Sequence, residues 1–322
     1  MPIELDLLDK KILYELDLDS RQHISTLAKA VKASKETVNF RIKRLSKERY
    51  IKKFITTINI SNLNSYYYKL FYKFYQATPE VEQKIIQFIE EYPKTAWLGT
   101  FEGPYDLAFL ILAKSIYDLD EFLVKFRKLF GIYILEQEIH VITSVHRFNA
   151  KFFHSSTKTL HTHYPKTLKE SKIDELDHNL MKELANNSRS PILTLAHRFK
   201  VDSGTIIYHI KKLKKEGILG TSTLALNFER FGLQHFQVNF KLKDYDSVKK
   251  IIAFFSQHAK ATFATTTLGR YDLAIELVVK NNQELKSIFD SIKKLYSTDI
   301  IDYDTFLITK EFNVTWYPND NR

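Results

Sequence analysis

The stretch that decides the fold reads SKETVNFRIKRLSKER and runs from Ser34 to Arg49. Its apolar residues Val38, Ile42 and Leu45 recur at the spacing of one helix face, and Ser34 is a suitable amino-terminal cap. Two shorter stretches with helical periodicity precede it. Three helices with a short turn before the last predict a helix-turn-helix.

The same pattern occurs a second time, as DSGTIIYHIKKLKKEG from Asp202 to Gly217. With a shift of 168 residues, the windows 9–51 and 177–219 match at 16 of 43 positions without a gap. Further along the shift becomes 166, which aligns residues 103–108 with residues 269–274. The chain is therefore a tandem duplication with a net loss of two residues in the second copy.

A second pattern follows each helix-turn-helix and is clearest in copy two. Apolar and polar residues alternate over 235–242, which predicts a half-buried strand. Helices are expected at 247–258 and 282–296, with two strands joined near Gly269 between them and a final strand at 301–309. This βαββαβ order is that of a ferredoxin-like domain.

The expected fold class is α+β, with two tandem copies of a helix-turn-helix (winged-helix-like) domain followed by a ferredoxin-like βαββαβ domain. The expected bounds are 1–60 and 173–228 for the helix-turn-helix domains, 61–150 and 229–322 for the ferredoxin-like domains, and 151–172 for a linker. The linker is rich in Ser, Thr, Lys and His and lacks hydrophobic periodicity, so it is expected to be a tether.

Composition narrows the class of partner. The formal net charge of +10 and the pI near 9.3 favour a polyanion such as nucleic acid. The absence of cysteine excludes a disulfide scaffold and thiolate metal sites, and no glycine motif for a nucleotide is present. The longest apolar run, Leu107 to Ala113, is far shorter than the roughly 18 residues of a membrane span. A cytoplasmic location without membrane association is expected.

The third helix of each copy differs in charge. Residues 34–53 carry a net charge of +6, whereas the matching residues 202–221 carry +2. Lysine and arginine on such a helix neutralise phosphates, so double-stranded DNA is the expected partner and copy one is expected to dominate. The expected DNA contacts are Ser34, Lys35, Thr37, Asn39, Phe40, Arg41, Lys43 and Arg44 in copy one, and Ser203, Thr205, Tyr208, His209, Lys211 and Lys212 in copy two.

These residues resemble the Lrp/AsnC family, the leucine-responsive or feast/famine transcription regulators. The resemblance rests on residues 5–13, on Asp19-Ser20-Arg21, on Leu27-Ala28 and on the pattern Ser34-x-x-Thr37-Val38-x-x-Arg41-Ile42-x-x-Leu45, most of which copy two repeats. Two positions depart from the family pattern. Arg49 stands where the family usually has a glycine suited to a left-handed helix end, and His209 stands where copy one has Arg41.

The resemblance implies that the second domain of each copy senses a ligand and dimerises, as the RAM domains of the family do. It implies an amino-acid effector near a Gly-x-x-Asp loop, here formed by Gly103, Tyr105 and Asp106 and by Gly269, Tyr271 and Asp272. A purely structural role is equally open, because glycine suits a hairpin and aspartate accepts backbone N–H bonds. Two such domains in one chain are expected to dock as an intramolecular pseudo-dimer, and further homo-oligomerisation is an additional expectation.

Other readings remain open beside a non-enzymatic regulator. Siroheme decarboxylases contain Lrp-like units and use histidine and arginine near their second-domain strands, but residues 95–98 and 261–264 contain neither. An architectural protein that does not select DNA sequence is a further alternative. His161, His163 and His154 could suggest a metal site, but a polar tether explains them better. No catalytic residues, cofactor or metal are therefore expected.

Overall fold

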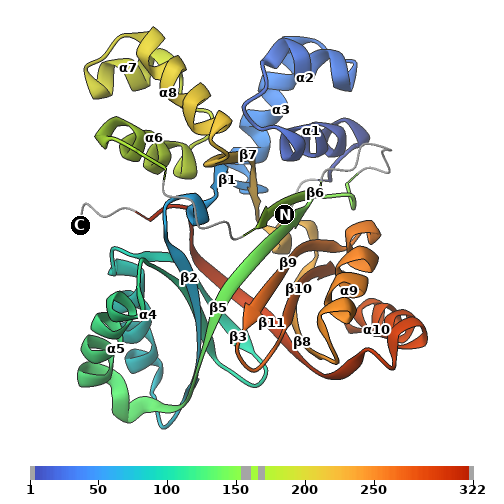
Figure 1. Cartoon of the computed structure of the whole chain (residues 1–322). Coiled ribbons are helices and arrows are strands. Elements are labelled where there is room, and N and C mark those ends of the chain that lie inside the picture. Colours follow the sequence, from blue (N-terminus) through green and yellow to red (C-terminus); the bar gives the residue numbers. More distant parts are fainter. Residues whose placement is uncertain (1–3, 154–160, 166–170, 319–322) are drawn as a thin grey trace.

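The structure, a computed structural model, describes residues 4–153, 161–165 and 171–318. Each copy begins with three helices that form a helix-turn-helix head (Figure 1). The helices are α1 (Leu7–Leu18), α2 (Ile24–Val31) and α3 (Lys35–Lys47) in copy one, and α6 (Glu175–Asn186), α7 (Ile192–Phe199) and α8 (Ser203–Lys215) in copy two. Among the described residues, no helix has both the length and the apolar character needed to span a bilayer.

The heads form where the sequence predicts them because caps and apolar periodicity agree. The Ser34 hydroxyl accepts a hydrogen bond from the Thr37 backbone N–H at 3.1 Å, which caps α3. Val38, Ile42 and Leu45 are the buried residues of α3. The predicted helix-turn-helix is therefore confirmed in copy one, and α8 repeats it with Ile206, Ile210 and Leu213 buried.

The two heads are joined by a strand pair and share their cores. Strand β1 (Ile51–Ile58) follows α3 and runs antiparallel to β7 (Leu219–Leu226), which follows α8. Leu224 and Leu226 of β7 lie in the core of the first head, while Ile58 of β1 lies in the core of the second. Each head is therefore completed by the other copy, so the strand pair couples their positions.

The remaining strands form one large sheet in which each copy contributes four strands in the ferredoxin-like order. These strands are β2 (Tyr66–Phe74), β3 (Thr95–Glu102), β4 (Leu107–Ala113) and β5 (Ile134–Phe148) in copy one, and β8 (Gln234–Leu242), β9 (Ala261–Leu268), β10 (Leu273–Val279) and β11 (Ile300–Val314) in copy two. The order within the copies is β5-β2-β4-β3 and β11-β8-β10-β9. Because β3 pairs with β11 and β9 pairs with β5, the eight strands close on themselves.

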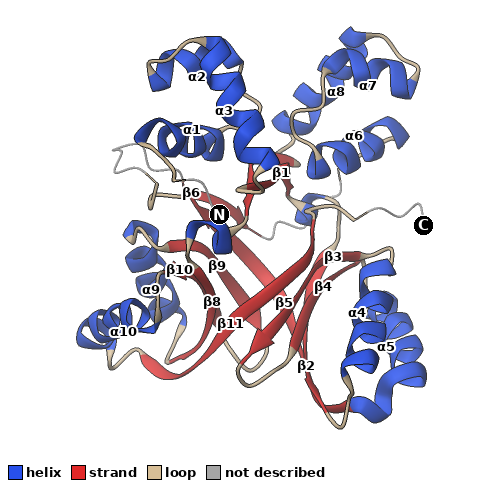
Figure 2. Ribbon diagram, turned by 180° about the vertical axis from the view of Figure 1, so that it is seen from behind, coloured by secondary structure: helices blue, strands red, loops and turns tan. Residues whose placement is uncertain are grey.

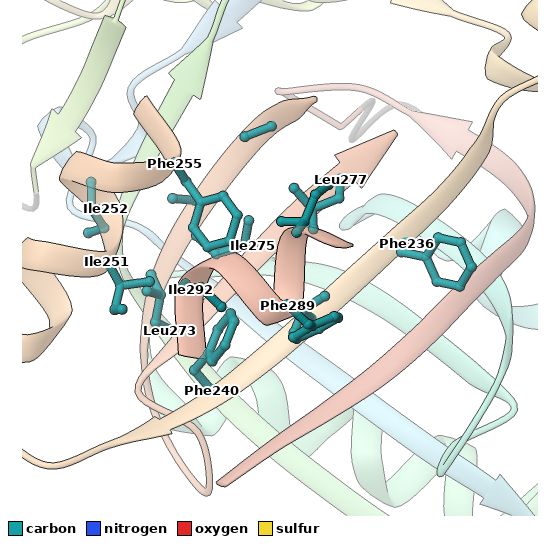
Figure 3. Close-up of a cluster of buried hydrophobic side chains, with 14 of the residues drawn as sticks. Phe236, Phe240, Ile251, Ile252, Phe255, Leu273, Ile275, Leu277, Phe289 and Ile292 are labelled. Atoms are coloured by element: carbon teal, nitrogen blue, oxygen red, sulfur yellow. The ribbon is translucent and has the colours of Figure 1, made fainter. Parts of the chain in front are cut away.

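Helices cover the outside of this closed sheet, two from each copy (Figure 2). They are α4 (Pro79–Glu91) and α5 (Ile116–Phe130) in copy one, and α9 (Tyr245–Gln257) and α10 (Asn282–Tyr296) in copy two. Three short 3-10 turns, η1 (Ile60–Asn62), η2 (Gly131–Tyr133) and η3 (Phe228–Phe231), connect the elements. Figure 3 shows the core between the helices and strands of copy two, where Phe240, Ile251 and Phe289 lie together.

Closure of the sheet overturns one expectation for β8. The alternation over 235–242 predicted a strand with one buried and one solvent-facing side. Phe236 and Phe240 do pack in the core under the helices. However, His235, Gln237 and Asn239 on the other side are buried as well, because that side faces the interior of the closed sheet. The polar face of β8 is thus an internal surface.

The expected tether is also partly wrong. Within residues 151–172, His161–Pro165 forms strand β6, which pairs antiparallel with the far end of β5 from Ser144 to Phe148. The tyrosine hydroxyl of Tyr164 hydrogen-bonds to Thr57, and the ring of His163 stacks on His146 with centroids 4.1 Å apart. A short polar strand has no hydrophobic period of its own, so its pairing with β5 was not visible in the sequence. His154 lies outside the described residues.

Candidate nucleic-acid interface

The outward side of α3 is open to solvent. Lys35, Asn39, Phe40, Lys43 and Lys47 are all exposed, and Phe40 retains 65% of its accessible surface. These positions follow the helical repeat and lie on the face opposite the buried residues. Within the described ranges, none of the three lysines takes part in an ion pair with the protein itself. The face therefore presents free cationic groups beside an amide and an aromatic ring.

The matching face of α8 is similar in outline and differs in detail. Tyr208 replaces Phe40 and is 64% exposed, and Lys211 and Lys215 replace Lys43 and Lys47. Two polar residues of α3 have no close equivalent in α8. The short, uncharged Ser203 stands for Lys35, and the apolar Ile207 stands for Asn39. The difference between the two faces lies mainly at their amino-terminal halves.

Arg41 and Arg44 have internal partners. Both guanidinium groups bind the fully buried carboxylate of Asp9 in α1, at 3.1 Å from Arg41 Nη1 and 2.6 Å from Arg44 Nη2. Arg41 also binds Asp6 at 2.7 Å. A count of charges places both arginines among the expected DNA contacts, because it does not reveal a buried partner in another helix. In the structure they fix the angle of α3 against α1.

We call this arrangement, a buried aspartate of the first helix bound by two cations of the third helix, the clamp. The second head has a clamp with other cations. His209 Nδ1 lies 2.8 Å and Lys212 Nζ 2.6 Å from the buried carboxylate of Asp177. Burial alone would raise the pKa of Asp177, but the hydrogen bonds from Lys212 and His209 lower it on balance. With the clamps set aside, the excess charge of the first head comes from residues such as Lys35 and Arg49, which are exposed.

The remaining predicted contacts lie at the helix starts. The hydroxyl of Thr37 is 3.0 Å from that of Ser34, so both belong to the cap of α3. In copy two, Thr205 donates to the carboxylate of Asp202 through its hydroxyl at 2.6 Å, and Ser203 is half-buried. The start of α3, where N–H groups point outward, is suited to phosphate, whereas the Asp202 carboxylate at the start of α8 disfavours it.

The Gly-x-x-Asp loops have a structural role in both copies. The carboxylate of Asp106 accepts hydrogen bonds from Lys73 Nζ and the Phe74 N–H, both at 2.7 Å. Asp272 accepts the equivalent bonds from Lys241 at 3.3 Å and from the Leu242 N–H at 2.8 Å. Each aspartate therefore links its hairpin to the first strand of its ferredoxin-like domain, which is β2 in copy one and β8 in copy two.

The loop glycines and tyrosines complete the same packing. Gly103 has φ +146°, and a Cβ there would lie 2.9 Å from the Thr305 carbonyl oxygen, so only glycine fits. A Cβ on Gly269 would meet the His140 ring at 2.8 Å. Tyr105 and Tyr271 are each 2% exposed. The structure thus gives all six predicted effector residues contacts within the fold itself.

The closed sheet also holds a cavity of about 180 Å³, lined on one side by residues 223–226 of β7, which was not predicted from the sequence. Aromatic residues from both copies line it, together with several titratable groups. The titratable lining residues are Asp17, Lys52, Lys69, His140, Arg147, His235, Tyr67, Tyr271, Glu276 and Glu311. The sequence signal that could have indicated this cavity is the set of aligned positions at which only one of the two copies has an aromatic residue.

Comparisons with known proteins agree with this geometry. A family model described as winged helix-turn-helix DNA-binding matches residues 5–52 and 173–219. An HTH-type transcriptional regulator of Pyrococcus furiosus is 31% identical over 142 residues, which are 44% of this chain and 93% of the relative. The regulatory protein AsnC of Haemophilus influenzae is 25% identical over 137 residues, which are 40% of this chain and 89% of that protein.

A solved structure matches the whole tandem arrangement. The siroheme decarboxylase NirDL aligns with a TM-score of 0.65 and 14% sequence identity, covering 96% of this chain and 93% of that chain. At this identity the likeness concerns the fold alone.

Heads with exposed basic helices, carried on two ferredoxin-like units, define a tandem winged helix-turn-helix protein of the DNA-binding class. With a relative at 31% identity covered over 93% of its length, the chain belongs to the Lrp/AsnC family of helix-turn-helix transcription regulators.

Proposed function

We propose that the protein binds double-stranded DNA sequence-selectively, with α3 in the major groove as the principal reading helix and α8 as an assisting one. The observation that carries this proposal is the open face of α3, where Lys35, Asn39, Lys43 and Lys47 are exposed and the three lysines have no acidic partner among the described side chains. A helix held at its back by a clamp and free on its front is suited to groove binding.

The residues of this face take different roles. Asn39 lies in the first half of α3, and an asparagine amide can bond an adenine edge in a bidentate manner. Lys35 lies at the start of the helix and also suits a base edge, since lysine pairs with guanine acceptors. Lys43 and Lys47 lie further along and neutralise phosphates. Arg41 and Arg44 serve mainly to hold the helix through Asp9.

The two heads are held in a defined relation. The hydroxyls of Ser20 and Ser188, which are equivalent residues of the two copies, lie 2.6 Å apart. Arg189 donates to the Ser20 carbonyl oxygen at 2.8 Å, and Arg21 donates to the Ser190 carbonyl oxygen at 3.2 Å. The recognition faces are related but not identical, so the DNA site is expected to have two unequal halves.

The test is enrichment of duplex fragments from a random pool by the full-length protein, followed by fluorescence anisotropy. Specific sites typically bind 10³-fold or more tightly than random DNA. An enriched fragment that binds at least about 10³-fold more tightly than random duplex at one salt concentration supports the proposal. Equal affinities for both would contradict it and favour an architectural protein.

A tetrapyrrole enzyme is the second candidate, favoured by the whole-chain likeness to NirDL and by the basic groups of the cavity. Although residues 95–98 and 261–264 lack histidine and arginine, His140, Arg147 and His235 reach the cavity from β5 and β8. A volume of about 180 Å³ is nevertheless below the roughly 300–1,000 Å³ of ordinary ligand pockets, and a tetrapyrrole is larger still than a small metabolite. Absence of a haem-like absorption change on adding an iron tetrapyrrole would exclude this candidate.

A further inference from the structure

The interior of the closed sheet has two equivalent halves, related by the duplication, and only one of them is filled. The filled half, at the β3–β11 seam, contains Phe71, Trp97, Phe101, Tyr105, Ala108, Phe306 and Ile308. The shift of 168 residues for β2 and of 166 for the later strands gives their counterparts as Asn239, Phe263, Thr267, Tyr271, Ala274, His140 and Ile142. All seven counterparts line the cavity.

Three exchanges make the second half hollow. Asn239 replaces Phe71, Thr267 replaces Phe101, and His140 replaces Phe306. In the filled half these three phenylalanines contact one another, with ring centroids between 5.8 and 6.4 Å apart. Protein interiors are close-packed, and an unfilled space of this size forfeits packing energy. The same fold therefore packs this space with phenylalanine in one half and leaves it open, with polar walls, in the other.

The acidic groups in the wall of the cavity already have partners. Glu311 accepts hydrogen bonds from Lys52 at 3.1 Å and from the Trp97 indole at 2.9 Å. Glu276 lies 3.1 Å from His235 Nε2. The third acid, Asp17, is bound by Arg147 and by the Ala150 N–H, the latter at 2.7 Å. All three acids in the wall are therefore already bound by groups of the protein, which leaves capacity on the cationic side chains to bind an added acid.

Two cationic groups supply that capacity. Lys69 is buried, and its ammonium donates to the Gln237 amide oxygen at 2.5 Å and faces the rings of Trp97 at 4.9 Å and Phe71 at 5.6 Å. An ammonium has three donors, and these contacts include no carboxylate. Arg147 is 4% exposed, and its Nη1 has no hydrogen-bond partner among the described residues. A buried donor without a partner carries a substantial desolvation cost.

We infer that this cavity binds a small organic carboxylate with a compact apolar body. The carboxylate meets the open donors of Lys69, and the body lies against the aromatic walls, which include Trp97, Phe263 and Trp316. A volume of about 180 Å³ suits a ligand smaller than the drug-sized molecules of typical pockets. The site is separate from the two Gly-x-x-Asp carboxylates, which are bonded within their hairpins.

The cavity is also connected to the heads, and this step rests on the proposed DNA-binding function. Thr223, Leu224 and Leu226 of β7 form part of its wall, and the two leucines belong to the core of the first head. Asp17, the partner of Arg147, is a residue of α1. A ligand in the cavity therefore lies against a wall that belongs to the core of the first head, and it is expected to change DNA affinity.

Binding itself is tested without DNA. The chain has two tryptophans, Trp97 and Trp316, and both line the cavity, so their intrinsic fluorescence reports on its occupancy. The full-length protein is titrated with benzoate, phenylpyruvate and 4-methyl-2-oxopentanoate, with benzamide as the uncharged analogue of benzoate. We expect a saturable change with at least one acid and at least tenfold weaker binding of the amide. Lack of saturation with all three acids, or equal binding of benzoate and benzamide, overturns the inference.

Variants separate binding from folding. Lys69→Met removes the buried charge while keeping a side chain of similar length, and it is expected to weaken carboxylate binding at least tenfold. Thr267→Phe, which copies the filled half, is expected to abolish binding by occupying the space. Lys125→Met removes a charge from the exposed side of α5 and serves as the matched control. Unchanged affinity in Lys69→Met and Thr267→Phe, both folded by circular dichroism, contradicts the site.

The link to DNA is measured separately, by anisotropy with and without a saturating carboxylate. A change in DNA affinity that disappears in Thr267→Phe supports the coupling. An acid that binds without altering DNA affinity leaves the cavity as a ligand site but contradicts its coupling to the heads. Failure of DNA binding under all conditions contradicts the proposed function and leaves the fluorescence result standing.

Discussion

The two copies of the repeat have diverged in different places. Copy one carries the more polar reading face, with Lys35 and Asn39 where copy two has Ser203 and Ile207. In the sheet interior, Asn239 and Thr267 of copy two and His140 of copy one stand where the other copy has phenylalanine. In a dimer of identical chains every substitution occurs twice. In a single chain it occurs once, so the two faces and the two interior halves are free to differ.

The contact between Lys69 and Gln237 illustrates this freedom. The two residues are equivalent positions of the two copies, 168 residues apart, and they meet inside the sheet. Two lysines at these positions would bring like charges together in a desolvated interior, which is strongly unfavourable. The duplication therefore permits a buried cation that a symmetric dimer would have to avoid.

The largest effect, on the free energy of unfolding, is expected when the buried aspartate of either clamp is removed. Asp9→Ala is expected to lower the free energy of unfolding by about 3 kcal/mol, because it removes the buried partner of Arg41 and Arg44. Asp177→Ala should cost less, since an imidazole replaces one of the guanidinium groups and bonds to carboxylate less strongly. Urea unfolding measures both, with the exposed Asp120→Ala as control. A larger loss in Asp177→Ala would contradict the comparison.

The next effect concerns phosphate contacts by the heads. The double variant Lys43→Ala with Lys47→Ala in α3 is expected to reduce the magnitude of the slope of log affinity against log salt by about 1.8. At about 0.1 M salt this corresponds to a roughly 60-fold loss of DNA affinity. The matched pair Lys211→Ala with Lys215→Ala in α8 should have a smaller effect, because α8 lacks the counterparts of Lys35 and Asn39 that seat the helix. Anisotropy over a salt series gives both slopes. A greater loss from the α8 pair would make copy two the dominant head.

A third prediction concerns the stability of the hollow half. Burial lowers the pKa of Lys69 to about 8, against the opposing influence of Glu276 and Glu311. Holding a charged lysine there at pH 7 is destabilising, so Lys69→Met should raise the free energy of unfolding by about 2 kcal/mol. The variant would thus gain stability while losing the carboxylate, an outcome that misfolding cannot produce.

The pH dependence of that gain has a definite sign. Because the folded-state pKa of Lys69 lies below that of an unfolded lysine, the unfolded chain binds more protons between about pH 8 and 10, and stability rises with pH there. The difference between Lys69→Met and the natural chain should therefore shrink as the pH is raised from 8 to about 10. Urea unfolding at several pH values measures it, and a difference that grows over this range would argue against a charged lysine in the cavity.

The smallest effect on stability is expected from substitutions at the residues that follow the two recognition helices. Arg49 and Gly217 are equivalent residues that follow α3 and α8, and both have a left-handed backbone, with φ of 58° and 69°. Arg49→Gly should therefore stabilise the first head by about 1 kcal/mol, and Gly217→Ala should destabilise the second by about as much. Opposite signs in thermal unfolding are expected. Equal signs would show that side-chain contacts outweigh the backbone.

Much of the fold was predictable because its signals are local. The helix predicted at 282–296 is observed as α10 with the same bounds, and α3 ends within two residues of the quoted stretch. The alternation over 235–242 correctly predicts the strand β8, but it also predicts a polar side in solvent, and that side is buried. That error arises because closure of the sheet depends on β3–β11 and β5–β9 pairing between copies, which no local pattern encodes.

The candidate sites were less predictable for the same reason. The charge of Arg41 and Arg44 was visible, but the buried Asp9 that binds them lies in another helix. The cavity depends on residues such as Asn239 and His140, each ordinary in its own strand. Their meaning emerges only when each is compared with its phenylalanine counterpart in the other half.

The most direct test of reading by α3 is the sequence preference of an Asn39→Ala variant. Enrichment from random duplex DNA should yield the site of the natural protein with preference lost at one position of one half, because an alanine cannot bond a base edge. Ile207→Ala, at the equivalent position of α8, should leave that half unchanged. An Asn39→Ala protein that enriches the same sequences with the same preference at every position would contradict reading by α3.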